Sequence, residues 1–369
     1  MSLAGADPAP IFLVGIQGAM SYGPRDRNVV GGRILCVFVL LGFAPALALS
    51  DAGRSVRRTG VPGGLRVSYS WNDPRGVART IEASVDEAAL ADSELALGFT
   101  CDELRAFLME AEARIRAERG LSAVDIARKV VASKSDGDWV RVGENVASDF
   151  QFVLRTEGSG DPGRAAEIDE IIRTSQKAWE SSRKTIEKRL EKEMDAFLSS
   201  RGMMRTAGGI AVDYRRLVRE NRGRLAALSA KFKKVCGADK RSLLEAVLSF
   251  VQGIPSRPRP AAENGRYTAG LAVPLRVLAD DSGDCDSKAV LFASLWTALC
   301  RYRTILITVK EHMLVGVAVP FAEGTAVEFD GLRYALLEVN CGGSLLPGEI
   351  TSYSLALVDR GLFKYRIVS

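Results

Sequence analysis

The segment from Ser282 to Trp296, "SGDCDSKAVLFASLW", restricts the fold more than any other part of this sequence. Gly283 followed by Asp284 is typical of a helix start, with the aspartate as the N-cap. The residues after Asp286 are apolar on nearly every face of such a helix. A helix that is hydrophobic all round is buried. We therefore expect a central helix that other elements cover on all sides.

Cys285 lies in the first turn of this predicted helix, between two aspartates. Further along the helix a cysteine would be ordinary packing, but in the first turn the helix dipole favours a thiolate. The carboxylates of Asp284 and Asp286 act in the opposite direction and raise the pKa of the thiol. A protonated imidazole in contact with the sulfur should outweigh them if both aspartates point into solvent.

His312 is the only histidine of the chain, where average composition would supply about two per hundred residues. It stands at the head of the predicted strand "HMLVGVAVP", in which His312, Leu314 and Gly316 share one face. A cysteine nucleophile needs a base to remove its proton. His312 is therefore the one imidazole that can serve Cys285.

Glu338 is a carboxylate inside the apolar segment "YALLEVN", where burial without a partner is costly. If this segment pairs with the strand of His312, Glu338 can bind the imidazole and fix its tautomer. Arg301 or Arg303 is the alternative partner. The set predicts a triad of nucleophile, base and orienting acid at the amino end of the Cys285 helix. The backbone N–H of Cys285 is one oxyanion donor, and a second is not identified.

Three stretches, "GDCDSKAVLFASLW", "EHMLVGVAV" and "YALLEVN", together resemble the core of the transglutaminase-like superfamily, particularly its bacterial cysteine-peptidase-like members. The resemblance covers about residues 210–350. It implies nucleophile Cys285 on a central helix, with base His312 and acid Glu338 on the following strands. The acid here is Glu where Asp is more usual in that family, and Glu338-Val339-Asn340 replaces its "DPT"-like continuation.

These residues predict an exported cysteine-dependent amide hydrolase that acts on a peptide or protein of the cell envelope through a thioester. An acyl transferase that passes the acyl group to an amine and crosslinks proteins is the closest alternative. A catalytically inert binding module of the same fold is another. The third is a structural envelope protein in which Cys285 serves packing or a disulfide.

Composition and charge indicate which classes of partner and cofactor this protein can bind. The 369 residues are 47% hydrophobic and 26% charged, enough for two ordinary domains with a core. The net charge of +5 is small, and no basic block is interleaved with aromatic residues, so we expect no nucleic-acid binding. One histidine and no CxxC spacing argue against a zinc site, and no cofactor or metal is expected.

Residues 1–50 are predicted to be a signal peptide or an N-terminal anchor. Arginines precede an apolar run at residues 34–50 that contains the small-residue site Ala46-Leu47-Ala48. Cleavage there would place the protein in the periplasm or outside the cell. The alternatives are a membrane tether through residues 34–50 that faces the periplasm, or a buried helix; the run is short for a span of about 20 residues.

Five cysteines remain after such cleavage, and an oxidising compartment can pair four of them. The odd number leaves at least one thiol free. Parity alone does not show which cysteine is free. The five are Cys285 and the four others Cys101, Cys236, Cys300 and Cys341.

The predicted fold class is α+β. Alternation over residues 64–90 indicates strands, and a charged amphipathic helix follows over residues 100–120. We therefore expect a small α+β module over residues 51–160, a long connecting helix over residues 161–204, and a transglutaminase-like catalytic domain over residues 205–369. The catalytic domain is expected to begin with helices over 214–237 and 239–254 and to continue, after the Cys285 helix, with strands over 303–310, 312–320 and 332–340.

The long helix carries one narrow apolar seam with steps of three and four residues. Such a helix packs along the protein body or joins two domains; a dimerising coiled coil through residues 163–200 is the alternative. The seam consists of Ile168, Ile172, Ser175, Trp179, Ser182, Ile186, Leu190, Met194 and Phe197.

Overall fold

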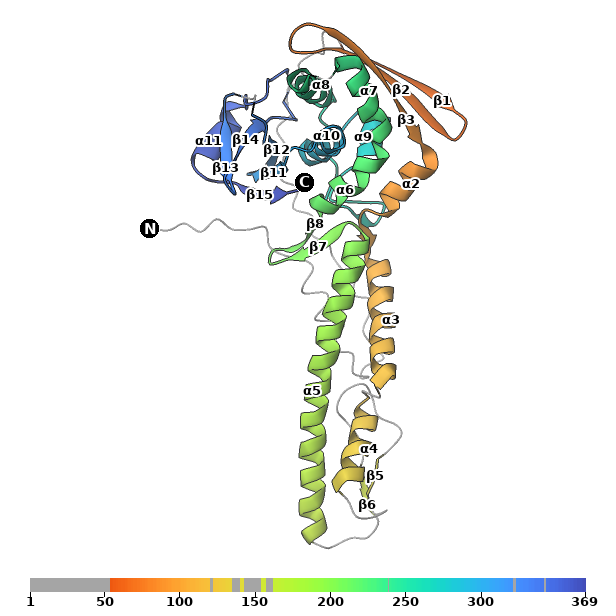
Figure 1. Cartoon of the computed structure of the whole chain (residues 1–369). Coiled ribbons are helices and arrows are strands. Elements are labelled where there is room, and N and C mark those ends of the chain that lie inside the picture. The colour runs from red at the N-terminus through yellow and green to blue at the C-terminus, as the bar shows by residue number, and fades with distance from the viewer. Residues whose placement is uncertain are drawn as a thin grey trace. The chain divides into compact units, whose positions relative to one another are not determined.

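The structure is a computed structural model that describes residues 54–119, 122–134, 140–142, 154–156, 162–237, 239–320, 323–341 and 343–369. It combines helices with several antiparallel sheets, which confirms the predicted α+β class (Figure 1). The signal or anchor segment predicted over residues 1–50 lies outside the described residues. Within the described ranges, no helix is long and apolar enough to cross a membrane.

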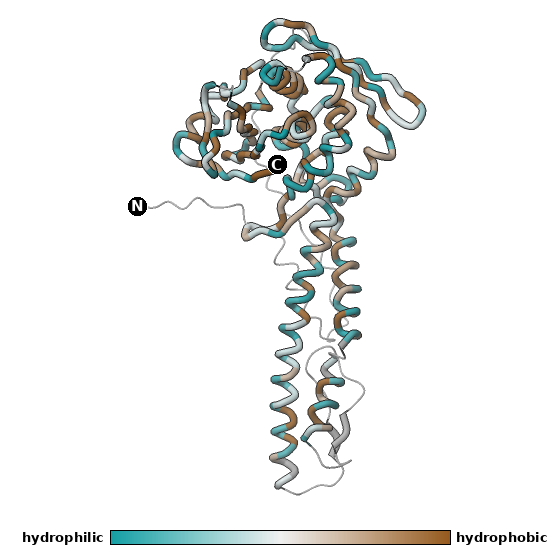
Figure 2. Tube along the Cα trace, in the orientation of Figure 1, coloured by the Kyte–Doolittle hydropathy of each residue, from teal (hydrophilic) through white to brown (hydrophobic). Residues whose placement is uncertain are grey.

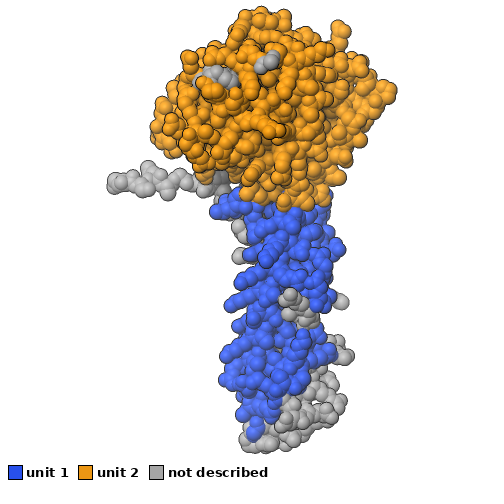
Figure 3. Space-filling view, in the orientation of Figure 1, with its two compact units in different colours: residues 1–43, 101–198, 205–210 blue, residues 44–100, 199–204, 211–369 orange. Residues whose placement is uncertain are grey.

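The described residues form two compact units (Figure 3). Unit 1 holds residues 101–198 and 205–210, and unit 2 holds residues 54–100, 199–204 and 211–369. The predicted module over residues 51–160 is therefore wrong, because residues 54–100 belong with the C-terminal half. Their alternation showed that one face is buried, but alternation does not show which partner covers that face.

Unit 1 is built on a long helix, α5 (Pro162–Ser200, whose last two residues belong to unit 2). Figure 2 shows both hydrophilic and hydrophobic stretches along it. Its other elements are α3 (Cys101–Arg119), α4 (Ala123–Lys134), β5 (Val140–Val142) and β6 (Leu154–Thr156).

The apolar seam of α5 packs against helices of the same unit. Ile186 and Leu190 share a buried cluster with Ile115 of α3, and Trp179 packs with Ile126 of α4. Ile172, which we predicted in the seam, is 39% exposed. In this structure α3 and α4 cover the surface on which the coiled-coil alternative depended.

Unit 2 contains a five-stranded antiparallel sheet in the order β13-β14-β12-β11-β15. The three strands predicted from the sequence are its central ones, and short edge strands flank them. β12 aligns His312 with Val309 of β11, and Val315 with Leu337 of β14. The strands are β11 (Thr304–Val309), β12 (His312–Val317), β13 (Ala326–Phe329), β14 (Leu332–Leu337) and β15 (Lys364–Ile367).

The helix that carries Cys285 is α10 (Cys285–Leu299), and it is central as predicted. Nearly all of its residues are buried, and Phe292 and Trp296 are completely so. It packs against β11 and β12 and against four helices. These are α6 (Tyr214–Arg224), α7 (Ala226–Cys236), α8 (Lys240–Gln252) and α9 (Pro274–Asp280). The single helix predicted over residues 214–237 is thus two, separated at the buried Leu225.

Residues 54–100 supply a second sheet to unit 2. Trp71 donates from its indole to the Ser249 hydroxyl (3.1 Å), and the Tyr69 hydroxyl donates to the Leu278 carbonyl (2.5 Å). These bonds tie the sheet to α8 and α9. The sheet consists of β1 (Ser55–Val61), β2 (Gly64–Asn72) and β3 (Ala78–Asp86).

The remaining elements of the described chain are short. They are α2 (Glu87–Leu95), β4 (Phe99–Thr100), β7 (Met203–Thr206), β8 (Gly209–Val212), β9 (Ala262–Glu263), β10 (Arg266–Tyr267) and α11 (Ser352–Asp359). α11 matters for the site, since its Val358 joins the buried cluster of Leu314, Tyr334 and Leu336 on the sheet.

Gly316 gives a test of this packing. A Cβ atom added there would lie 2.7 Å from Cγ1 of the buried Ile305 and 3.3 Å from Cβ of Tyr334. Gly316→Ala should therefore lower the free energy of unfolding by about 1–3 kcal/mol in urea titration. Gly223→Ala is the control, because nothing lies within 4 Å of that exposed helical position and stability should stay equal or rise slightly. An unchanged stability in Gly316→Ala would contradict this packing.

Candidate active site

Cys285 occupies the first turn of α10. The side chain of Asp284 is the N-cap and accepts a hydrogen bond from the Ser287 N–H (3.1 Å), as predicted. The thiol is half-buried. The backbone N–H of Met313 lies near enough to the sulfur to favour its anionic form. The sulfur therefore lies within hydrogen-bond reach of the peptide group that joins His312 to Met313.

His312 and Glu338 are joined by a hydrogen bond. The pairing of β12 with β14 brings the two together, and Nε2 of His312 meets Oε1 of Glu338. Arg303 instead lies 3.7 Å from Asp330 on the surface. The predicted contact between histidine and glutamate is confirmed, and the alternative with Arg301 or Arg303 is wrong.

Glu338 is completely buried and has donors for both carboxylate oxygens. Thr351, the N-cap of α11, donates to Oε2 from its backbone N–H and its hydroxyl (3.3 Å each). Burial opposes ionisation of this carboxyl, but the hydrogen bond and charge of His312 and the donors of α11 outweigh it and hold the pKa of Glu338 below its ordinary value. An ionised Glu338 only accepts, so Nε2 of His312 carries the proton and Nδ1 is left as the base.

The Cys285 thiol lies near the residue that follows His312, but it is not hydrogen-bonded to the imidazole. No hydrogen bond joins Cys285 to His312, both of which belong to the described residues. His312 shares its sheet face with Leu314 and Glu338, the face that packs with α11. Nucleophile–base hydrogen bonds are often long before substrate binds. That His312 faces the start of α10 therefore stays a prediction, since only the backbone of the next residue, Met313, lies near the sulfur.

Asp286 departs from the solvent-facing orientation that we required of it. It is half-buried, and its carboxylate accepts from the Tyr214 hydroxyl (3.1 Å) and the Ser287 N–H (3.0 Å). Burial and the neighbouring charge of Asp284 raise the pKa of Asp286 to about 8. The side chain turns toward α6 because Tyr214 supplies a partner there, which the local sequence does not show.

The pKa of Cys285 is raised to about 12, first by burial and then by the charges of Asp286 and Asp284. The Met313 N–H opposes this shift without cancelling it. The resting group at neutral pH is therefore a neutral thiol, rather than the standing thiolate–imidazolium pair that we predicted. Any attack by this sulfur needs a base that removes its proton during the reaction.

Asp286→Asn tests this electrostatic account. Removal of a negative charge lowers the pKa of the Cys285 thiol, and a fall of one unit means about ten times more thiolate. Below pH 8 the native Asp286 is mostly protonated, so the variant should change little there and should accelerate alkylation by iodoacetamide at higher pH. Asp330→Asn, in the exposed turn before β14, is the control. Slower alkaline labelling in Asp286→Asn would refute the assigned sign.

The sequence analysis assigned no role in the site to two residues of this region, Lys288 and Asn340. Lys288 is 1% exposed, and its Nζ donates to the carbonyls of Gln252 (3.2 Å) and Ile254 (2.7 Å) and to Oδ1 of Asn340 (3.2 Å). Burial lowers the pKa of Lys288 to about 8. A lysine one turn after Cys285 in an otherwise apolar helix was the signal, since a buried ammonium demands partners.

The cysteines show no disulfide. All five in the described part of the chain are free thiols, so the pairing of four that an oxidising compartment would allow is not seen. Within the described part of the chain, no three or more His, Cys, Asp or Glu side chains form a group that could hold a metal ion.

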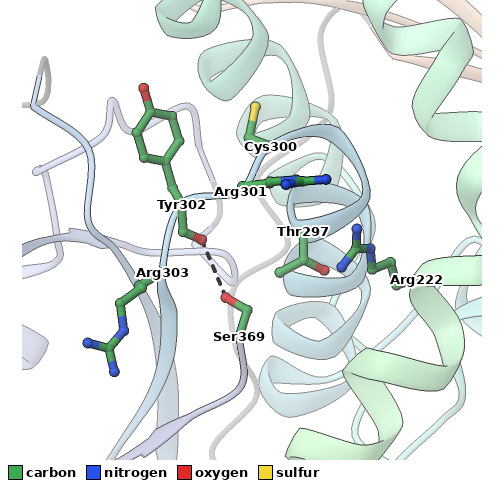
Figure 4. Close-up of a pocket in the computed structure, with 7 residues that line it drawn as sticks. All are labelled: Arg222, Thr297, Cys300, Arg301, Tyr302, Arg303 and Ser369. Atoms are coloured by element: carbon green, nitrogen blue, oxygen red, sulfur yellow. Dashed lines mark hydrogen bonds between the residues drawn. The ribbon is translucent and has the colours of Figure 1, made fainter.

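A pocket of about 380 Å³ lies at the carboxyl end of α10, beside Thr297 and Cys300. Figure 4 shows Arg222 and Arg301 extending toward each other there. Cations near helix carboxyl ends are favoured by the dipole, and Arg222 lies in the last turn of α6. With a rise of about 1.5 Å per residue, the length of α10 puts this pocket roughly 20 Å from Cys285. It contains none of the predicted site residues.

Comparisons with protein-family models, with curated proteins and with solved structures found no match for this chain.

Proposed function

We propose that unit 2 is a cysteine-dependent amide hydrolase with a transglutaminase-like core, acting on a peptide or protein. Cys285 is the nucleophile, His312 the base and Glu338 the group that orients it. The observation that carries the proposal is the hydrogen bond between His312 and the buried Glu338, beside Met313, whose backbone N–H lies near the Cys285 thiol. A fully buried carboxylate bonded to the only histidine of the chain is the arrangement that a general base and its orienting acid require.

The reaction begins when Nδ1 of His312 takes the thiol proton as the sulfur attacks the amide carbonyl. The carbon–nitrogen bond then breaks, the amine leaves with the proton from His312, and a thioester remains on Cys285. Water attacks the thioester while His312 accepts a proton from it. The acid leaves and the proton returns to the sulfur, which restores the thiol. The carboxylate of Glu338 stabilises the imidazolium that exists between these steps.

The raised thiol pKa decides the timing of proton transfer. A resting thiolate is scarce, so removal of the proton and attack of the sulfur occur together. The aspartates that raise the pKa also make the thiolate, once formed, a stronger nucleophile.

The test is a reaction with p-nitrophenyl acetate, an activated acyl donor. The protein should release a burst of p-nitrophenolate and gain one acetyl group, which intact-mass and peptide mass spectrometry should place on Cys285. Release of the acetyl group to added primary amine faster than to water would assign acyl transfer instead of hydrolysis. Acetylation spread over lysines, with no burst of p-nitrophenolate, would refute both hydrolysis and acyl transfer at Cys285.

We also propose export of the protein, supported by the pattern of residues 34–50 alone. The sequence of the mature N-terminus, read from protein secreted by its own cell, should begin after residue 48. A start at residue 1 would leave the membrane tether through residues 34–50.

A further inference from the structure

An amide-cleaving thiol enzyme must stabilise the oxyanion of its tetrahedral intermediate, and such sites combine backbone and side-chain donors. The N–H of Cys285 at the start of α10 is one donor. We propose that the side-chain amide of Asn340 is the second, with Nδ2 directed at the oxyanion. This inference rests on the proposed function.

Lys288 fixes the orientation of that amide. Its Nζ lies 3.2 Å from the Asn340 side chain. An ammonium group has only donors, so the atom it faces must be the oxygen and not the nitrogen. This settles the usual ambiguity of an amide side chain. The NH₂ group of Asn340 then points away from Lys288, and no acceptor for it occurs among the described residues.

The position of Lys288 places Asn340 at the amino end of α10, where Cys285 lies. Residues three apart on a helix are neighbours on one face, which holds for Cys285 and Lys288. Both residues lie in the first turn of α10, where the helix begins. Asn340 also follows Glu338 by two residues, so one short segment supplies both the acid of the triad and the proposed donor.

The segment that carries Asn340 is held firmly. Gln252 donates from its amide to the carbonyls of Glu338 (2.9 Å) and Leu345 (3.0 Å), on either side of Asn340. The Cys341 thiol donates to the Gly343 carbonyl (3.0 Å). Lys288 itself is fixed by two backbone carbonyls besides Asn340. A donor held in this way needs no reorganisation when charge develops on the substrate, which is what makes an oxyanion site effective.

Asn340→Asp separates this role from a structural one. The new side chain keeps the size of asparagine and an oxygen for Lys288, but it has no N–H to donate. Acetylation of Cys285 by p-nitrophenyl acetate passes through an oxyanion and should fall on the order of 10²- to 10³-fold. Alkylation by iodoacetamide forms no oxyanion and reports only the reactivity of the thiol. The quantity to compare is the ratio of the two rates at one pH, because the added charge can shift the thiol pKa.

Asn340→Ala removes both the oxygen and the donor and should lower the same ratio. Asn264→Asp, in the exposed turn between β9 and β10, is the control and should leave it unchanged. Thermal melts show whether each variant is folded. A ratio equal to that of the native protein in a folded Asn340→Asp would overturn the inference and leave Asn340 as a structural partner of Lys288. Absence of acetylation in the native protein would refute the proposed function itself.

Discussion

Cys285→Ala is expected to abolish the burst of p-nitrophenolate and to return ester cleavage to the uncatalysed rate, a loss on the order of 10⁴-fold. The reason is that the acyl group of the proposed intermediate is carried by this sulfur. The cost in stability should be small, about 1 kcal/mol, because Cys285 is only half-buried and donates no hydrogen bond to the fold. Stopped-flow absorbance and intact mass measure the two effects in the same preparation.

Cys236→Ala is the matched control for this variant. Cys236 is also a free, half-buried thiol, located at the end of α7. Its replacement should leave both the burst and the acetyl mass at Cys285 intact. A burst that survives in Cys285→Ala and disappears in Cys236→Ala would assign the chemistry to a different cysteine.

Glu338→Gln is expected to reduce acetylation of Cys285 on the order of 10³- to 10⁴-fold while the fold persists. Thr351 occupies one oxygen of the carboxylate with two donors. An amide in this position keeps its oxygen toward Thr351 and turns its NH₂ group to Nε2 of His312. The proton of the imidazole then moves to Nδ1, and the ring can no longer act as a base toward the thiol. The acetylation rate against pH measures the loss.

Glu245→Gln controls for the removal of a buried charge. Glu245 is 8% exposed and pairs with Arg75 (2.7 Å) in the same unit, without contact to His312. It should change stability without changing the rate at Cys285. Glu338→Asp keeps the charge on a shorter side chain and should retain more activity than Glu338→Gln. Equal rates in Glu338→Gln and the native protein would show that the carboxylate does not orient the base.

The parts of the fold that follow from local pattern could be predicted. The apolar run after Asp284 requires a covered helix, and it became the center of unit 2. The segments of His312 and Glu338 pair antiparallel although β13 lies between them in the chain, and this pairing placed the two side chains together. The spacing of apolar residues and the cost of burying the Glu338 charge were sufficient to predict the central helix and the contact between His312 and Glu338.

The parts that depend on distant partners could not be predicted. Residues 54–100 show a buried face in their alternation, but their cover is formed by helices about two hundred residues later in the chain. Asp286 was expected in solvent because its partner, Tyr214, belongs to another helix. The same holds for Lys288, whose three acceptors come from two other segments. Side-chain burial of this kind depends on the tertiary structure and produces no periodic pattern in the sequence.

The most direct test of the proposed nucleophile and base is the alkylation rate of Cys285 against pH, in the native protein and in His312→Ala. Assistance by the imidazole predicts appreciable labelling of the native protein at neutral pH, where a thiol with a pKa of about 12 would react slowly without help. His312→Ala should lose that component and keep only the alkaline rise of a buried thiol with a raised pKa. Coinciding profiles for the two proteins would contradict the pairing of Cys285 with His312 and, with it, the proposed hydrolase.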